Sequence, residues 1–311
     1  MRYPHAGGGQ IPPGGICYIF CMRDGYLIID GHAHIFPDQD VSSRIMSSFN
    51  ERFSIAFQPA GDGTPASLLS DMRQAGIDYT ILANFASNRF LHENNLWTLS
   101  LASTSPALVP LVSFSPALLQ DHNIDSLFAQ YHALGARGIK LHPMAQEFDP
   151  ADSAILPVYS LAARHKLPVV FHCGRVANAR LNGWADYQIL LPLIEAFGET
   201  TFILTHMVDG SERDLRDAVR FENVCFDTSI VLSGYDRILE TNEPSWRNDA
   251  LFVSLVRELG ADRFVFGSDH PWGSARADLE RFLRMPLAAS EKRAILGENA
   301  RRLFLIDGQG Q

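Results

Sequence analysis

Short runs of β-branched and aromatic residues alternate with segments of helical periodicity from Tyr26 onward. This alternation predicts repeated β–α units, rather than an all-β or all-α fold. Eight such units in about 250 residues favour an α/β single-domain (β/α)8 TIM barrel over an open doubly wound sheet, whose first turn would carry a glycine-rich phosphate loop. The expected strands are Tyr26 to His34, Tyr79 to Asn84, Leu108 to Phe114, Gly138 to His142, Pro168 to Cys173, Thr201 to His206, Asn223 to Asp227 and Arg263 to Ser268.

Three of the intervening segments carry helix signals of their own. Thr64 and Pro65 predict an N-cap and a first-turn proline, and Gly76 marks the end of that helix. Ser211 and Asp214 resemble the start of a capping box. A third helix is indicated by an apolar stripe at helical spacing, formed by Leu251, Phe252, Leu255, Val256 and Leu259.

Two connections are longer than the usual few residues, and both follow the carboxyl end of an expected strand. They run from Ile35 to Gly63 and from Ser229 to Asn248. Because the active site of a TIM barrel lies at the carboxyl ends of its strands, we expect both connections to act as candidate lids.

The first 21 residues are rich in glycine and proline and hold only a short apolar patch, Ile16 to Cys21, which is weak for a signal peptide. We expect residues 1–21 to form a disordered leader and residues 22–311 to form the barrel domain. Met22 precedes the first strand closely, so an alternative start of translation there stays open.

Composition narrows the class of protein. The net charge is −9, from 26 Lys+Arg against 35 Asp+Glu, which argues against nucleic-acid binding. No apolar run approaches the roughly 18 residues of a membrane span. The four cysteines are too few and too scattered for a disulfide scaffold, so we expect a cytoplasmic protein. The expected partner is a small-molecule substrate; a homodimer is a common default, although no apolar seam identifies one.

Candidate metal ligands stand where several strands end. His32 and His34 are two residues apart, so their imidazoles point to the same side of one strand. His172, His206 and Asp269 close three further apolar strands. Each alone is equally well explained as a strand-end polar residue bonded to backbone or water, but side chains at the carboxyl ends of four barrel strands converge on one face. Together they indicate a metal centre.

These residues belong to an ordered set of motifs. The motifs are DGHAH at His32 and His34, GIKLHP at Lys140, VVFHCG at His172, ILTH at His206, GSDHPW at Asp269 and ILGENARRLF at Ile295 to Phe304. The sequence resembles the amidohydrolase superfamily, specifically its amidohydrolase-related branch of metal-dependent hydrolases and decarboxylases. The resemblance extends from Tyr26 to about Leu305.

The resemblance implies one divalent ion held by His32, His34, His172 and Asp269. A mixed histidine and carboxylate set suits zinc, our first choice, while manganese, iron and cobalt stay open. His206 is implied either as a further ligand or as the side chain that polarises substrate and moves protons.

Lys140 leaves the number of metal ions open. In similar binuclear members a lysine here is carboxylated and bridges two ions, whereas other members carry an unmodified side chain. A free ammonium group facing the ion would be repelled, so an inward Lys140 must be carboxylated, have a lowered pKa or bind an anionic substrate group. We expect one metal ion, with a second as the alternative.

Three further residues are candidates for substrate binding. His142 lies two residues beyond Lys140 on the same strand face, and Arg175 follows the His172 motif, where its guanidinium could bind a carboxylate. Trp272 follows Asp269 by three residues and is a candidate pocket wall. Each has an equally ordinary structural explanation, in loop hydrogen bonding, a salt bridge or packing.

The main functional hypothesis is hydrolysis of a small carbonyl substrate, such as a lactone, amide or ester, that is anionic. Asp269 would accept the proton of a metal-activated water, and His206 would stabilise the oxyanion. The alternative is non-oxidative decarboxylation of a small aromatic or unsaturated acid. A barrel that binds metal without catalysis ranks lowest, because no ligand position of the implied set is missing.

Overall fold

Nine short parallel strands form the centre of the part of the chain that the structure describes. A computed structural model describes residues 23, 25–55, 58–176, 178–232 and 248–306. The expected leader and most of the second long connection lie outside these described residues. The strands are β1 (Ile29–Ala33), β2 (Tyr79–Leu82), β3 (Leu108–Pro110), β4 (Val112–Ser113), β5 (Ile139–Leu141), β6 (Val169–Phe171), β7 (Phe202–Leu204), β8 (Val224–Asp227) and β9 (Phe264–Val265).

Each strand pairs with its neighbour in chain order, β1 to β3 in one group and β4 to β9 in another. The expected strand from Leu108 to Phe114 contains both β3 and β4, which Leu111 separates. The Leu111 amide donates to the carbonyl of Leu82 at 3.1 Å, so hydrogen bonding to β2 continues across this break. The two groups therefore form one continuous sheet.

The sheet closes because the chain after β9 pairs with β1. The Gly31 amide donates to the Phe266 carbonyl at 2.8 Å, and the Asp269 amide donates to the His32 carbonyl at 2.9 Å. A parallel bridge also joins Ala33 to His270. This closure confirms the expected TIM barrel, and it places Asp269 directly beside His32 of β1 and His34, which follows that strand.

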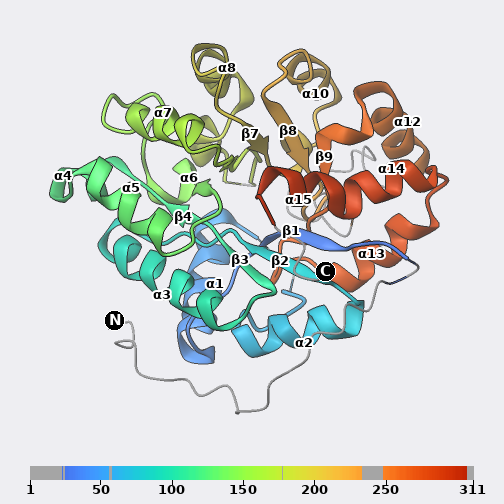
Figure 1. The fold of residues 1–311 in the computed structure, drawn as a ribbon, viewed down its shortest axis with the longest axis horizontal. Helices are drawn as coiled ribbons and strands as arrows, with labels where there is room; N and C mark the ends of the chain where they lie inside the picture. The colour runs from blue at the N-terminus through green and yellow to red at the C-terminus, as the bar shows by residue number, and fades with distance from the viewer. Residues whose placement is uncertain (1–22, 24, 56–57, 177, 233–247, 307–311) are drawn as a thin grey trace.

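Helices surround the strands in a ring (Figure 1). Short 3₁₀ turns lie at Asn88–Phe90, Ala179–Trp184 and Ala261–Arg263, and a π-helical turn lies at Ala294–Glu298. The helices are α1 (Gln39–Phe53), α2 (Pro65–Ala75), α3 (Leu91–Thr104), α4 (Pro116–Asp121), α5 (Ile124–Ala133), α6 (Pro143–Gln146), α7 (Leu156–Arg164), α8 (Tyr187–Ala196), α10 (Glu212–Ala218), α12 (Asp249–Leu259), α13 (Ala275–Arg284), α14 (Ala289–Arg293) and α15 (Asn299–Leu303). The segment α9 (His206–Asp209) is a left-handed turn, because φ is positive at His206, Met207 and Val208.

The three helices predicted from local signals are confirmed. Thr64 caps α2 by accepting from the Ser67 amide, and Gly76 ends the helix with a φ of 74°. Ser211 caps α10 by accepting from the Asp214 amide. In α12 the predicted stripe faces the core, with Leu251 at its partly buried edge.

The hydrophobic core has two principal layers. Side chains on the outer face of the strands pack against the surrounding helices. Alternate side chains fill the inside of the barrel, including Ile29, Ile81, Val170 and Ile203. Phe304, which follows α15 and is fully buried, packs in the same inner cluster. The barrel interior is therefore a packed core, and the space for chemistry lies beyond the carboxyl ends of the strands.

A bulge in β1 determines which way its histidines point. Ile29 packs inside the barrel, whereas Ala33 packs in the outer layer, although they are four positions apart and strict alternation would put them on the same face. The pairing with β2 shifts between Asp30 and Ala33, where β1 contains one extra residue. Such a bulge reverses the alternation of side chains. As a result His32 and His34 face the inside of the barrel, where strict alternation from Ile29 would have turned them outward.

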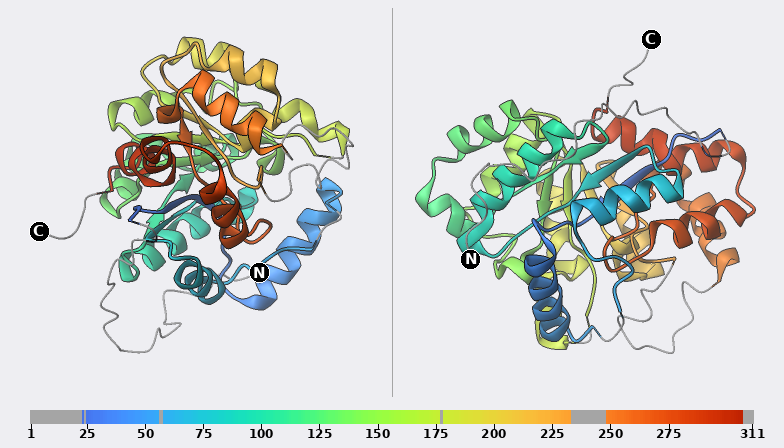
Figure 2. Two further views of the ribbon diagram at one scale, coloured as in Figure 1. Left: turned by 90° about the vertical axis from the view of Figure 1, so that its right-hand side faces the viewer. Right: turned by 90° about the horizontal axis from the view of Figure 1, so that it is seen from below.

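The first long connection, expected as a lid, consists largely of the helix α1. Figure 2 shows α1 at one end of the barrel, beyond the ring of helices. Arg52 forms an ion pair with Glu147 at 2.7 Å, and Asn50 accepts from the Trp272 indole at 2.8 Å. These contacts fix α1 across loops that follow the strands, so this connection forms a wall of the site.

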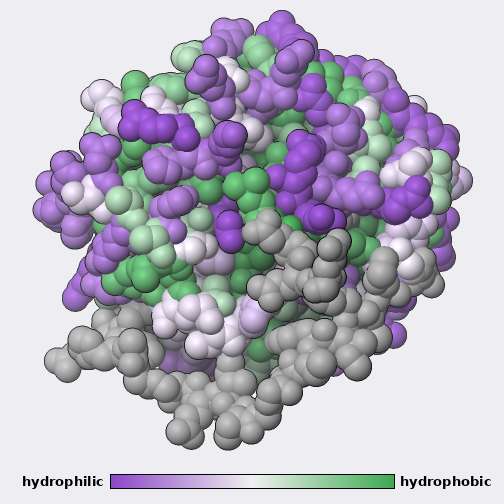
Figure 3. Space-filling model, in the orientation of Figure 1, coloured by the Kyte–Doolittle hydropathy of each residue, from purple (hydrophilic) through white to green (hydrophobic). Residues whose placement is uncertain are grey.

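The surface in Figure 3 is largely hydrophilic over the helices, with scattered hydrophobic side chains. Within the described ranges, the large hydrophobic side chains that are well exposed are Leu134 and Leu305. No helix in this part of the chain is long and apolar enough to cross a membrane.

The close packing of Gly31 against β9 can be tested through stability. A Cβ atom at Gly31 would lie 2.4 Å from Cγ1 of Val265 and 2.8 Å from the Phe266 carbonyl oxygen. Gly31→Ala should therefore force β1 and β9 apart and lower the free energy of unfolding by roughly 1–3 kcal/mol, measured by urea denaturation. Gly198→Ala is the matched control, because its Cβ would meet nothing within 4 Å. Equal stability of the two variants would contradict the tight contact at the bulge.

Candidate metal centre and active site

Three buried side chains direct their ligand atoms to a common space at the carboxyl end of the barrel. Nε2 of His32 lies 3.1 Å from Nε2 of His34. Oδ1 of Asp269 lies 3.6 Å and 3.3 Å from these two nitrogens. All three ligand atoms lie within 4.8 Å of one another. Two imidazoles and a carboxylate arranged in this way form a candidate site for a divalent cation.

The tautomer of His32 supports metal binding. Its Nδ1 lies 2.7 Å from Oδ2 of Asp227, and both side chains are fully buried. Since the carboxylate can only accept, Nδ1 carries the proton and Nε2 presents a lone pair toward His34 and Asp269. A carboxylate behind a histidine is the usual outer support of a metal-ligating imidazole.

Burial and charge give this group of three one negative charge at neutral pH. Burial lowers the pKa of His34 to about 4. It also lowers the pKa of His32, and nearby Lys140 acts in the same direction. Burial alone would raise the pKa of Asp269, but its hydrogen bond with His34 and the surrounding histidines hold it well below the usual range. At neutral pH the group consists of two neutral imidazoles and one carboxylate.

His172, the fourth predicted ligand, pairs with His206 instead of joining that group of three. Nε2 of His172 donates to the Gly174 carbonyl at 3.2 Å, and Nδ1 of His206 donates to the Ser229 carbonyl at 3.0 Å. The remaining nitrogens, Nδ1 of His172 and Nε2 of His206, face each other at 3.3 Å. With both outer nitrogens protonated, neutral rings turn two lone pairs toward each other, an arrangement that a shared proton or a cation would stabilise.

Asp227 joins these two groups of histidines, and the sequence analysis did not single it out. While Oδ2 bonds His32, Oδ1 accepts from the His206 amide at 2.9 Å and from the Ser229 hydroxyl at 2.5 Å. The Ser229 hydroxyl oxygen in turn lies 2.9 Å from Nδ1 of His206. These contacts lower the pKa of Asp227 to about 2, despite a burial that would raise it. Its position at the end of an expected strand was the available signal, the same one that identified His172.

The backbone takes a left-handed conformation at both predicted catalytic residues. The φ angle is 56° at His206 and 62° at Asp269. Non-glycine residues adopt this region at an energetic cost, and they do so most often at functional sites. Here the hydrogen bonds from the two amides, to Asp227 and to the His32 carbonyl, hold the chain in place.

Lys140 points into the barrel directly beside the candidate metal ligands. It is fully buried, it pairs in register with the inward-facing Val170, and its Nζ lies 3.3 Å from Nε2 of His32. Burial lowers the pKa of Lys140 to about 8, although Asp227 and Asp269 act in the opposite direction. This position suits the predicted alternatives of carboxylation or contact with an anion.

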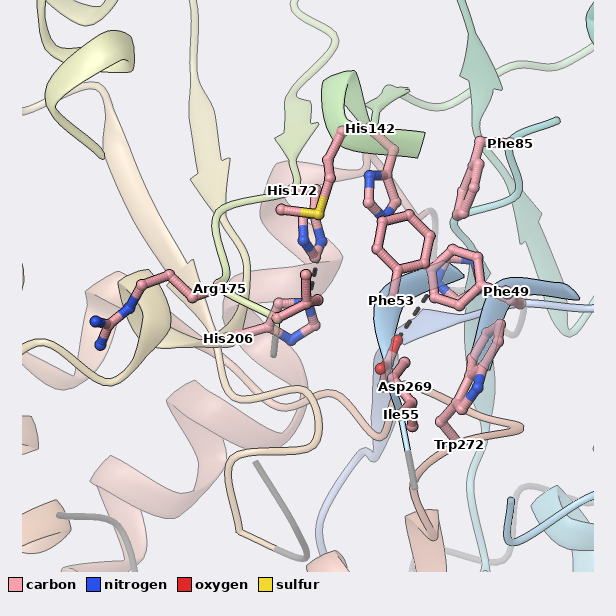
Figure 4. Close-up of a pocket in the computed structure, with 13 residues that line it drawn as sticks. Phe49, Phe53, Ile55, Phe85, His142, His172, Arg175, His206, Asp269 and Trp272 are labelled. Carbon is pink, nitrogen blue, oxygen red and sulfur yellow. Dashed lines mark hydrogen bonds and ion pairs between the residues drawn. The ribbon is translucent and has the colours of Figure 1, made fainter. Parts of the chain in front are cut away.

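An aromatic pocket opens next to this centre (Figure 4). Trp272, a predicted wall, packs against Phe49 of α1 with ring centroids 4.9 Å apart. His142 stacks on His172 with centroids 3.8 Å apart. Arg175 also lines the pocket, but its side chain is exposed and its guanidinium group points away from Asp269 in Figure 4.

Three phenylalanines of this pocket were not predicted from the sequence. Phe49 and Phe53 lie on α1, and Phe85 follows β2. Phe85 lies against His142 with ring centroids 4.5 Å apart. No local motif marks these residues, because their role depends on where α1 packs relative to the barrel.

Solved structures of the same fold include both hydrolases and decarboxylases. A putative 2-pyrone-4,6-dicarboxylic acid hydrolase from Pseudomonas putida is 20% identical, with a TM-score of 0.64 over 91% of this chain and 98% of that one. An amidohydrolase from Burkholderia multivorans with bound zinc is 15% identical, with a TM-score of 0.67 over 90% and 100%. A 5-carboxyvanillate decarboxylase from Novosphingobium aromaticivorans with bound manganese is 14% identical, with a TM-score of 0.62 over 90% and 97%.

Sequence comparison identifies a family for this chain but finds no matching curated protein. The sequence profile described as "Amidohydrolase" matches residues 29–306, which include the barrel strands, the three-residue ligand group and the paired histidines. The chain belongs to the amidohydrolase family.

Proposed function

We propose that this protein is a metal-dependent hydrolase of a small carbonyl substrate such as a lactone, amide or ester. The observation that carries the proposal is the convergence of His32, His34 and Asp269, with the tautomer of His32 set by Asp227. Family membership supports the general kind of reaction. The buried ligand group and the adjoining pocket support a catalytic role over metal storage.

His32, His34 and Asp269 would hold one divalent ion. His172 is proposed as a further ligand, and to bind the ion its Nδ1 would have to turn from His206 toward the group of three. A donor set of imidazoles and one carboxylate suits zinc, and structures of the same fold contain zinc or manganese. Such an ion supplies Lewis acidity, which polarises a substrate oxygen and makes water nucleophilic near neutral pH.

Two side chains of this chain are placed for proton transfer. Asp269 is ionised and lines the pocket, so its carboxylate can accept the proton of the attacking water. His206 is oriented by Ser229 and lines the same pocket. Its inner Nε2 can take up a proton, and the resulting Nε2–H can then pass that proton to the leaving group or donate a hydrogen bond to the negatively charged carbonyl oxygen. Arg175, Lys140, His142 and Trp272 are proposed to bind substrate.

Decarboxylation of an aromatic acid is the second candidate, and the pocket supplies the observation that favours it. Phe49, Phe85 and Trp272 present ring faces and edges that suit a planar ring. In that reaction His206 or Asp269 would deliver a proton to carbon after carbon dioxide leaves.

Isotope tracing separates the two reactions. Zinc-loaded protein is tested on lactones, amides, esters and aromatic acids in H2¹⁸O, while product mass and released carbon dioxide are followed. Hydrolysis places ¹⁸O in the product. Release of carbon dioxide without ¹⁸O in the organic product favours decarboxylation. Stoichiometric metal with no turnover across the whole panel indicates a non-catalytic barrel.

Asp269→Asn should reduce kcat by roughly 10²- to 10⁴-fold, because the amide cannot accept the proton that the carboxylate takes. Initial rates on the substrate found in that screen measure this loss. The asparagine side chain keeps one oxygen that can coordinate the metal, so the variant should still bind it. The metal content of the variant is measured in parallel by mass spectrometry. Near-normal turnover in a metal-loaded variant would refute the role of Asp269.

Asp227→Asn should weaken zinc binding by roughly 10- to 100-fold, because the amide no longer fixes the His32 tautomer. Competition with a fluorescent chelator measures the dissociation constant. Asp121→Asn is the control, since it removes the same charge at an exposed position of α4. Unchanged zinc affinity in Asp227→Asn would contradict the supporting role of this carboxylate.

A further inference from the structure

His142 has one ring nitrogen engaged by the backbone. It stands at the N-cap of α6, and the amide of Ala145 donates both to its Nδ1, at 3.3 Å, and to its carbonyl oxygen, at 3.0 Å. A nitrogen that accepts from an amide cannot itself carry a proton. In the neutral imidazole the proton must then reside on Nε2, the ring nitrogen farther from the backbone.

The ring of His142 is clamped by its neighbours. It stacks on His172 with an interplanar angle of 13°, and Phe85 packs on it at a centroid distance of 4.5 Å. The backbone amide of His142 donates a hydrogen bond to Oε1 of Gln146 at 2.8 Å, which fixes the start of α6. Figure 4 shows the ring between His172 and Phe85, where it lines the pocket.

The contact with Ala145 also favours the neutral ring. An imidazolium would direct an Nδ1–H group at the hydrogen of the Ala145 amide. Because Nδ1 of the neutral imidazole already accepts a hydrogen bond, the Nε2–H group is the one ring donor left for a ligand. That donor belongs to the tip of a side chain that lines the pocket.

We propose that His142 is a catalytic residue that donates a hydrogen bond from Nε2 to an anionic oxygen of the substrate, and that the Ala145 amide fixes the tautomer this requires. The inference rests on the proposed function, because it takes the aromatic pocket to be the substrate site. His142 transfers no proton in this role. It stabilises negative charge on oxygen, as a preorganised neutral donor does in an oxyanion hole.

The tautomer is tested directly by NMR of the zinc-loaded full chain labelled with ¹⁵N-histidine. Long-range ¹H–¹⁵N spectra distinguish protonated from unprotonated ring nitrogens, and the signals missing from His142→Gln assign this ring. We expect a protonated Nε2 and an unprotonated Nδ1 at pH 7. A protonated Nδ1, in either the other tautomer or the imidazolium ion, would overturn the inference.

Donation to an anionic oxygen is tested with benzoate, a planar carboxylate, as the probe. Benzoate should shift the Nε2–H resonance of His142. In His142→Phe, which keeps a planar ring but loses the donor, the Kd for benzoate should rise roughly 10- to 100-fold. His142→Gln retains an N–H group and should stay closer to the natural protein than His142→Phe. Equal Kd values for the natural protein and His142→Phe, or an unmoved Nε2–H resonance in the benzoate complex, would contradict the proposal.

The two proposals fail in different ways. Absence of zinc binding or of turnover in the natural protein would overturn the hydrolase assignment. The tautomer of His142 is set by the Ala145 amide, so its NMR result does not depend on turnover.

Discussion

One buried carboxylate, Asp227, organises the site. One of its oxygens fixes the proton on His32, and the other binds the amide of His206 and the hydroxyl of Ser229. Burying a charge without partners is costly, so these contacts are also what allow Asp227 to remain ionised inside the barrel. The orientation of the candidate metal ligands and of the paired histidines therefore depends on the same side chain.

Two features of the barrel bring the candidate metal ligands together: its closure between β9 and β1, and the bulge in β1. Hydrogen bonds between the chain after β9 and β1 place Asp269 beside His32 and His34. The bulge between Asp30 and Ala33 then turns both histidines inward. Gly31 lies within it, where a Cβ atom would collide with Val265 and the Phe266 carbonyl. A regular β1 would have kept the closure but directed the two imidazoles away from the carboxylate.

Much of this organisation was predictable from sequence, and the remainder has identifiable physical reasons. Apolar runs that end in His172, His206 and Asp269 located the strand ends, because buried parallel strands are near-continuous apolar runs and the polar residue marks where each run stops. The pairing of His172 with His206, rather than with His32 and His34, depends on side-chain hydrogen bonds to the carbonyls of Gly174 and Ser229. The bulge also lay beyond prediction, since alternation alone fixes the relative but not the absolute direction of His32 and His34. The phenylalanines of α1 reach the pocket through the packing of a whole helix.

The central claim is that His32, His34 and Asp269 hold a divalent metal ion. X-ray diffraction from zinc-loaded crystals, with anomalous data collected on both sides of the zinc absorption edge, tests it most directly. We expect one strong anomalous peak about 2.0–2.2 Å from Nε2 of His32, Nε2 of His34 and a carboxylate oxygen of Asp269. A fully occupied zinc ion bound elsewhere, with these three side chains still in mutual contact and no peak among them, would contradict it.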